Sequence, residues 1–324
     1  MSSHSINEPV DAVITWVDGY DQAHAEKLAS YLAKRGLDKR PEAAAPTRFN
    51  QQGELDYCVH SLLRFAPWLR TIYIVTDAQT PPLMKTFAGT PYENKVKLID
   101  HREIFFGFEH CLPTFNSLAI ESALWRINGL ANHFIYFNDD CFLIRPVHYE
   151  DFFRGSNLVF RGNWKTQTDK KWLTYFKKLV KTPKQNEHRI VQENSARLAG
   201  WQRKFFHLPH APFPIKKATL ENFFLQQPEL LAQNLNHPLR DQRQFWPISL
   251  SHHLEIKAKK VVFDNSLATI TINPASHNLT KIRNKLAQAD KKENVSFVCM
   301  QSMDTASKAT QTMMFEWLAK KIFY

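Results

Sequence analysis

The sequence predicts a three-layer α/β protein built on a mostly parallel sheet. Short runs rich in β-branched and aromatic residues alternate with longer segments of helical spacing. Strand and helix in alternation favour a sheet with helices on both faces. Four runs are typical of buried strands: residues 12–17 (AVITWV), 71–76 (TIYIVT), 95–99 (KVKLI) and 134–137 (FIYF).

Helical spacing is found in both halves of the chain. In the first half, Asn116 or Ser117 is suited to cap the helix that follows it. The second half is expected to be mostly helical, with one late strand at 295–300 (VSFVCM) before a C-terminal helix. The predicted helices span 21–35, 54–65, 116–127, 218–232, 239–254 and 279–289.

Composition narrows the class of protein. Hydrophobic residues make up 44% of the 324 and charged residues 23%, which is typical of a globular protein. A net charge of +11 favours anionic partners, but no nucleic-acid-binding motif is present, so nucleic acid is not expected. No apolar run approaches the ~20 residues that span a bilayer, and the N-terminus lacks a secretory signal. The four scattered cysteines predict reduced thiols in a cytoplasmic protein.

An acidic turn follows the first predicted strand. Ligands of parallel sheets bind outside the carboxyl ends of the strands, which directs attention to Asp18 and Gly19. Gly19 would let the backbone approach a ligand, and the indole of Trp16 could pack beside a base or sugar. Taken alone, the segment is explained better as a strand, a core tryptophan and a turn.

Two adjacent carboxylates, Asp139 and Asp140, follow the fourth predicted strand. Such neighbours repel each other unless a cation or a proton compensates. Mg²⁺ or Mn²⁺ on a diphosphate is the usual cation, because hard cations prefer carboxylate and phosphate oxygens. One aspartate could instead cap the next turn, but the pattern favours the metal site.

Histidines and an arginine form a third set, in residues 207–210 (HLPH) and 236–240 (NHPLR). Histidine is the commonest general base near neutral pH, and the planar fork of arginine suits phosphate. Any one of 14 histidines is more often structural than catalytic. His207 and Arg240 therefore need support from another observation.

That support is a resemblance. Four segments resemble, in order, the four blocks of the Stealth family of hexose-1-phosphate transferases, which comprises bacterial capsule and exopolysaccharide phosphotransferases and the animal N-acetylglucosamine-1-phosphotransferase. The first segment is DAVITWVDG and the fourth is FVCMQS. The segments span 11–19, then 48–81 with 112–140, then 207–215 with 237–240, and finally 297–302.

The resemblance implies a Rossmann-like, glycosyltransferase-A-like fold and assigns the site. By position in the family's motifs, the catalytic residues are Glu121, Asp140, His207 and Arg240, and the metal ligands are Asp139 and Asp140. The substrate-binding residues are expected to be Trp16, Asp18, Gly19, Arg48, Asn116 and Ser117.

Two departures from the family pattern bear on this assignment. Asp56 and His60 stand where the family's second block usually has arginines. Gln301-Ser302 replaces the Asn-Asp that usually ends the fourth block, and Asp304 is the candidate to substitute for it.

The activity implied is transfer of sugar-1-phosphate from a nucleotide-sugar, a UDP-hexose or UDP-N-acetylhexosamine, to a carbohydrate hydroxyl during capsule or other surface-polysaccharide synthesis. Mg²⁺ or Mn²⁺ is the expected cofactor. One catalytic domain is expected, with a core at 10–150, a basic insertion at 155–205 and a helical part at 206–324 that completes the site. The alternatives are a conventional glycosyltransferase and a non-catalytic, basic anion-binding module.

Two basic amphipathic segments raise the question of membrane contact. Trp172, Phe176 and Leu179 could share one helical face, and Met314 and Leu318 could share another near the C-terminus. Such helices can lie on the anionic inner face of a membrane. Packing against the core is their commoner fate, so peripheral membrane contact is the lesser alternative.

Overall fold

The computed structural model describes residues 8–36, 41–168 and 187–324. Its central sheet has five strands in the order β10-β4-β1-β2-β3, of which all but β10 are parallel. The predicted α/β fold with a mostly parallel sheet is therefore confirmed. The strands span Val10–Thr15 (β1), Ile72–Thr76 (β2), Val96–Asp100 (β3), His133–Asn138 (β4) and Phe213–Lys216 (β10).

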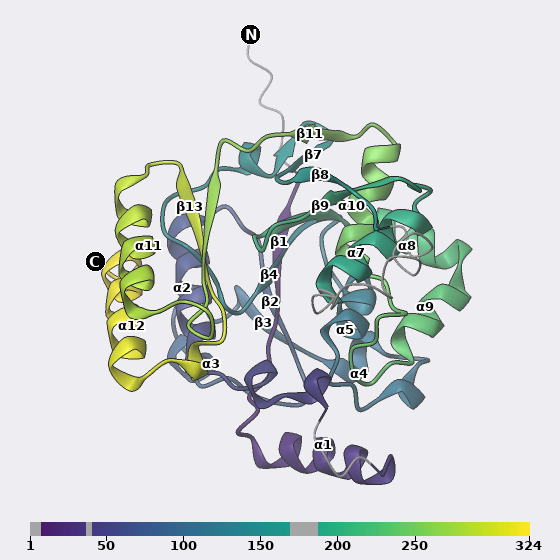
Figure 1. Ribbon diagram of the computed structural model, residues 1–324, viewed down its shortest axis with the longest axis horizontal. Helices are drawn as coiled ribbons and strands as arrows, with labels where there is room; N and C mark the ends of the chain where they lie inside the picture. Colours follow the sequence, from purple (N-terminus) through teal and green to yellow (C-terminus); the bar gives the residue numbers. More distant parts are fainter. Residues whose placement is uncertain (1–7, 37–40, 169–186) are drawn as a thin grey trace, which may run out of the picture.

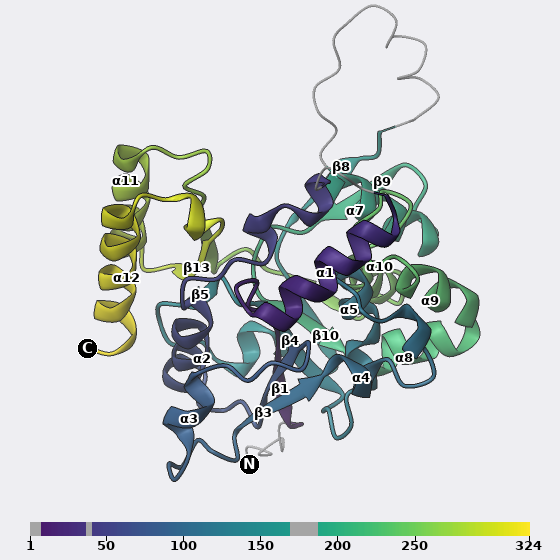
Figure 2. The same ribbon diagram turned by 90° about the horizontal axis from the view of Figure 1, so that it is seen from below.

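Helices cover both faces of this sheet (Figures 1 and 2). Helices α2 and α3 lie on one side of the strands, and α5 and α7 to α10 lie on the other. The helices span Gln22–Lys34 (α1), Glu54–Phe65 (α2), Leu83–Phe87 (α3), His101–Ile104 (α4), Ser117–Ala123 (α5), Glu187–Leu198 (α7), Lys217–Gln226 (α8), Pro228–Leu235 (α9), Pro247–Lys257 (α10), Leu279–Lys291 (α11) and Lys308–Ile322 (α12).

Smaller sheets bring the second half of the chain against the first. One has the order β12-β13-β5, another β11-β7-β6, and β8 pairs with β9. Within the first of these, Cys299 of β13 lies opposite Cys141 of β5. The strands span Cys141–Leu143 (β5), Phe153–Arg154 (β6), Asn157–Phe160 (β7), Asn163–Thr166 (β8), Lys204–His207 (β9), Val261–Phe263 (β11), Ala268–Ile272 (β12) and Val295–Met300 (β13).

Proline divides the helices of the second half differently from the sequence prediction. The helix predicted at 218–232 is two helices, because Pro228 cannot donate a hydrogen bond in a helix interior and instead begins α9. The helix predicted at 239–254 begins only at Pro247, which leaves Arg240 in a loop.

The cap predicted for α5 is confirmed. The side chain of Asn116 accepts a hydrogen bond from the backbone N–H of Leu118 at 3.0 Å. The helix ends earlier than predicted, at Ala123, and continues as the 3₁₀ turn Leu124–Arg126.

The apolar face of the C-terminal helix α12 packs inside the protein. Met314, Leu318 and Ile322 are buried in the main hydrophobic core, and Lys321 pairs with Asp290 at 2.7 Å. The other predicted amphipathic segment, with Trp172, lies outside the described residues. Among the helices of the described residues, none has the length and apolar character needed to cross a bilayer.

Candidate active site

A buried hydrogen-bond network lies where β1 and β4 end side by side. Thr15 and Asn138 are partners in the register of these two strands. The hydroxyl of Tyr136, on β4, lies 2.8 Å from the Thr15 hydroxyl and 3.1 Å from Asn138 Oδ1. It also donates to Glu121 Oε1 at 3.3 Å. Hydrogen-bonded polar side chains are thus buried at the carboxyl edge of the sheet.

Glu121 is held in this network by α5. Its other carboxylate oxygen accepts a hydrogen bond from the indole N–H of Trp246, the residue before α10. The side chain is buried, and burial raises the pKa of Glu121 to about 7 against the opposing effects of Trp246 and Arg240. Glu121 can therefore exchange a proton near neutral pH.

His210 connects the network to Asp140. Its Nε2 lies 3.1 Å from Asp140 Oδ1 and 3.4 Å from the side-chain nitrogen of Asn138. Burial favours neutral imidazole, but the neighbouring Asp140 carboxylate outweighs it and holds the pKa of His210 well above its usual range. His210 is therefore a cation paired with the aspartate.

Three more acidic side chains, Asp139, Glu54 and Asp304, lie near this pair. Burial, followed by the negative charges of Asp140 and Glu54, raises the pKa of Asp139 well above its usual range. The pKa of Glu54, at the start of α2, is raised by burial and by Asp140 and Asp304, although backbone N–H groups stabilise its charge. A cation would relieve this repulsion, and its ligands would be the carboxylate oxygens that Mg²⁺ and Mn²⁺ prefer.

Asp304 is engaged by the loop before α2. Its carboxylate accepts hydrogen bonds from Thr47 at 2.7 Å and from Asn50 at 3.1 Å. Ser302, one of the two residues that depart from the family pattern, has a positive φ of 53°. Asp304 thus links the segment after β13 to the loop before α2, and its charge acts on Glu54.

His207 is the last residue of β9. His188 is within electrostatic range of His207, His210 and Arg240, and its ring centroid is 4.8 Å from that of Trp246. Burial, followed by the charges of Lys165 and Arg189, lowers the pKa of His207. His207 is therefore neutral near pH 7, the state in which an imidazole can accept a proton.

Arg240 is placed by the loop between α9 and α10. Its guanidinium donates to the hydroxyl of Ser117 at 2.7 Å, and its charge acts on Glu121. Arg48 lies in the same electrostatic neighbourhood as Arg240 and is 3.6 Å from Glu187. The structure thus places two arginines near the amino end of α5.

Asn116 has a structural task in this arrangement. Its side chain caps α5 and donates to the carbonyl of His237 at 2.7 Å and to Gln244 at 2.8 Å. These bonds fix the loop that carries Arg240 against α5. The position of the arginine therefore depends on Asn116.

The three predicted residues after β1 occupy different settings. The indole N–H of Trp16 is buried and has no hydrogen-bond partner among the described residues. The backbone of Asp18 is bound on both sides by the Gln79 amide, at 2.9 Å each. At Gly19, an added Cβ would lie 2.7 Å from Phe49 Cβ and 2.8 Å from its carbonyl oxygen. The glycine is thus required by chain packing.

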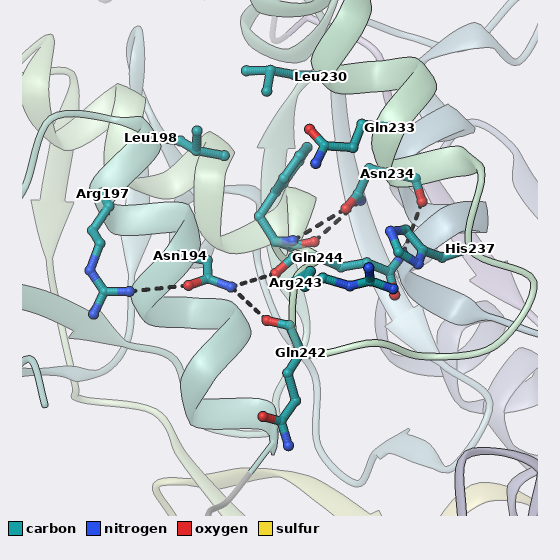
Figure 3. A pocket seen from close by; sticks show the side chains of 11 residues that line it. Asn194, Arg197, Leu198, Leu230, Gln233, Asn234, His237, Gln242, Arg243 and Gln244 are labelled. Carbon is teal, nitrogen blue, oxygen red and sulfur yellow. Dashed lines mark hydrogen bonds between the residues drawn. The ribbon is translucent and has the colours of Figure 1, made fainter. Parts of the chain in front are cut away.

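Two surface pockets flank the loop of Arg240. The one in Figure 3, of about 610 Å³, lies between α7 and α9 and contains none of the predicted site residues. In that view Asn194 joins Arg197 to the loop, and Asn234 lies against Gln244. The other, of about 490 Å³, is lined by Arg240, Arg35 and Arg243. The titratable network lies apart from the pocket in Figure 3, at the carboxyl edge of the sheet.

Several site residues were missed by sequence reasoning. His210 stood in the same HLPH segment as His207, and Glu54 stood in the second block, so both had a signal. Tyr136 and Trp246 had none, because an aromatic residue in an apolar run looks like core until its polar atom is seen to face a carboxylate.

The fold and this site define an α/β protein with an acid, histidine and arginine centre at the carboxyl edge of a parallel sheet. Residues 8–36 match the model of Stealth protein conserved region 1, and residues 48–160 match that of conserved region 2. The chain belongs to the Stealth family.

Its relatives carry names from polysaccharide synthesis. The exopolysaccharide phosphotransferase SCO2592 of Streptomyces coelicolor is 35% identical over 257 residues, which cover 76% of this chain and 25% of that protein. The capsular polysaccharide phosphotransferase LcbA of Neisseria meningitidis is 42% identical over 153 residues, 46% of this chain and 39% of that protein. The chain thus spans less than half the length of these relatives.

A solved structure of LgtC, titled as an active-site mutant, aligns with 96% of this chain and 95% of its own, with 11% identity and a TM-score of 0.46.

Proposed function

We propose that this chain transfers sugar-1-phosphate from a nucleotide-sugar, a UDP-hexose or UDP-N-acetylhexosamine, to a carbohydrate hydroxyl in the synthesis of a capsule or other surface polysaccharide. The observation that supports this most is the continuous network from Glu121 through Tyr136 and Asn138 to His210 and Asp140. It lies at the sheet edge where α/β proteins bind ligands, in a chain whose relatives are named phosphotransferases.

In this reaction the acceptor oxygen attacks the phosphorus bonded to the donor sugar. The P–O bond to the nucleoside monophosphate breaks, that monophosphate leaves, and the anomeric C–O bond stays intact. The acceptor proton passes to the neutral ring of His207. Such transfer depends mainly on positioning and charge stabilisation, so the guanidinium of Arg240 would stabilise charge on the transferred phosphate.

Glu121, His210 and Trp16 have supporting roles in this proposal. Glu121 would orient a donor or acceptor hydroxyl, with Trp246 and Tyr136 fixing its carboxylate. His210 would hold Asp140 in place. The buried N–H of Trp16 would donate to the nucleotide-sugar, and Arg48 and Ser117 would contact its phosphates or sugar. Asp18 and Gly19 would shape the turn beneath it.

A divalent cation fits the acidic group. Asp139 and Asp140 would hold Mg²⁺ or Mn²⁺, with Glu54 and Asp304 close enough to contribute charge. When bound, the cation would neutralise the donor's diphosphate. Burial, followed by the charges of Asp140 and Glu54, raises the pKa of Asp139, and a bound cation would offset both effects.

Product analysis tests the proposal. The purified protein is incubated with a panel of nucleotide-sugars and glycan acceptors, and the products are examined by phosphorus NMR and nucleotide chromatography. A phosphodiester and a nucleoside monophosphate are expected. A glycoside with nucleoside diphosphate would make the protein a conventional glycosyltransferase, and salt-sensitive binding of polyanions without turnover would make it a non-catalytic module.

The proposal includes a domain organisation and a location. We propose one catalytic domain with parts at 10–150, 155–205 and 206–324. It would act in the cytoplasm, with peripheral contact at the inner membrane face as the lesser alternative. Co-sedimentation with anionic but not neutral vesicles is the outcome that contact requires.

A further inference from the structure

A group of two thiols and an imidazole adjoins the acidic pair through His210, and its two cysteines have no part in the proposed transfer. Cys141, His210 and Cys299 each offer one ligand atom, and these atoms all lie within 4.8 Å of one another. They come from β5, from the segment after β9 and from β13. Three parts of the chain far apart in sequence thus present two thiols and an imidazole to one point.

The two thiols face each other because of strand register. Cys141 and Cys299 are opposite residues on antiparallel strands. The adjacent pair is joined by a bond from Met300 N to Asp140 O at 2.9 Å, so the cysteines occupy the non-hydrogen-bonded position, where side chains approach most closely. Their sulfur atoms lie within 4.8 Å of each other, and Cys299 Sγ donates to the carbonyl of His210 at 3.2 Å.

We propose that Cys141, Cys299 and His210 form a site for a thiophilic divalent cation, Zn²⁺ being the best match. Zn²⁺ binds sulfur at about 2.3 Å and imidazole nitrogen at about 2.1 Å, so tetrahedral ligand atoms lie roughly 3.5 to 4 Å apart. The three atoms, all within 4.8 Å of one another, would have to approach slightly to reach that spacing. Binding would release the proton that His210 holds beside Asp140, because a ligand imidazole is neutral, and water would fill the fourth position.

The chemistry of these donors separates this site from the proposed magnesium site. Thiolate and imidazole select zinc and related ions, whereas carboxylates without thiols select Mg²⁺ and Mn²⁺. Both thiols are buried, but His210 is 25% exposed, which leaves one open side for entry. A bound ion would clamp β5, β13 and the segment of His210 together and so stabilise the fold.

Cobalt substitution tests the inference without any measurement of activity. Reduced, metal-free, full-length protein is titrated with Co²⁺, and a sulfur-to-cobalt charge-transfer band with tetrahedral visible bands is expected at one ion per chain. Zn²⁺ should displace the cobalt, abolish the bands and raise the Tm. Absence of the charge-transfer band in the wild type would overturn the proposal, whatever the activity.

Variants locate the site. Cys141→Ala, Cys299→Ala and His210→Ala should each weaken zinc binding by at least ~100-fold, the upper end of what losing an outer-shell partner costs. Cys111→Ala is the matched control, since Cys111 is equally buried and lies outside the group, and it should bind like the wild type. A band that persists in the double variant of Cys141 and Cys299 would contradict the site. The site would also be contradicted if the isolated protein contained a disulfide between Cys141 and Cys299 and the reduced protein bound no cobalt.

Discussion

Asp140 illustrates how a single side chain can be tested without disturbing the fold. Asp140→Asn removes a negative charge at the proposed cation site with little change of shape, so transfer should fall by at least ~100-fold while the Tm stays near that of the wild type. Steady-state rates at saturating metal, with circular dichroism as the control for folding, measure both. Unchanged turnover would remove Asp140 from the site.

The proposed role of His207 as a base leads to a prediction about the pH dependence of the rate. If His207 accepts the acceptor proton, His207→Ala should lower kcat by ~100-fold or more and flatten the acidic limb of the pH–rate profile, because its depressed pKa sets that limb. Arg240→Ala should also lower kcat, by a factor that corresponds to about 3 kcal/mol, without that change in profile.

His210→Ala should instead raise the metal concentration needed for half-maximal rate, because it releases Asp140. A change only in the KM for the donor, in both His207→Ala and Arg240→Ala, would contradict their proposed roles.

Glu121 links folding stability to pH. Its pKa of about 7 in the folded protein exceeds its ordinary value of 4.5, so the folded state binds the proton more tightly than the unfolded chain. This contribution is complete below pH 4.5 and is lost as the pH rises through about 7. The wild type should therefore lose up to roughly 3 kcal/mol relative to Glu121→Gln across that window. Urea unfolding of both proteins at about pH 5 and pH 8 measures the difference. The same change in the free energy of unfolding for both proteins would refute the raised pKa of Glu121.

The sequence predicted a residue's place in the structure best where its position relative to the end of a strand determines that place. Asp140 and Asn138 follow an apolar run, so the rule for parallel sheets placed them at the correct edge. That His210, and not His207, contacts Asp140 could not be predicted in the same way. The deciding facts were the end of β9 at His207 and the direction the chain takes afterwards, and neither has a local sequence signal.

At the scale of elements, the turn after β1 is joined to the loop before α2 through a glycine. Gly19→Ala should lower the free energy of unfolding by about 1–3 kcal/mol, because the new Cβ meets the Phe49 backbone, which cannot rotate away. Shortening the Phe49 side chain should not restore stability, since its carbonyl carbon and oxygen remain. Chemical denaturation measures this effect. A rise in donor KM with unchanged stability would instead show that Gly19 serves the ligand.

Element boundaries departed from the sequence prediction mainly in the second half of the chain. Helix α2 begins and ends where its spacing predicted, at Glu54–Phe65. The apolar periodicity of 218–232 and 239–254 continued across sites where backbone geometry interrupts the helix. Pro228 and Pro247 mark those sites, and each begins a helix. Periodicity records which face is buried, whereas proline determines where the hydrogen-bonded turns start.

At the scale of the whole molecule, the acidic side chains at the proposed cation site come from both halves of the chain. Excess chelator should abolish transfer, and Mg²⁺ or Mn²⁺ should restore it, because acids from α2, from the end of β4 and from the segment after β13 repel one another at the site. Rates after dialysis and metal replacement measure this. Full activity in excess chelator would exclude the metal from the mechanism.

Strand β10 also has a consequence for how the protein is made. It pairs with the outer edge of β4. The ribosome synthesises β10 about 75 residues after β4, which ends at Asn138. A chain emerging from the ribosome therefore holds an open, strongly apolar strand edge until Phe213–Lys216 follows it. Such an edge is a template for pairing with neighbouring chains. Chains that stop before residue 213 should precipitate during expression, and translation pauses within that interval should raise the demand for chaperones.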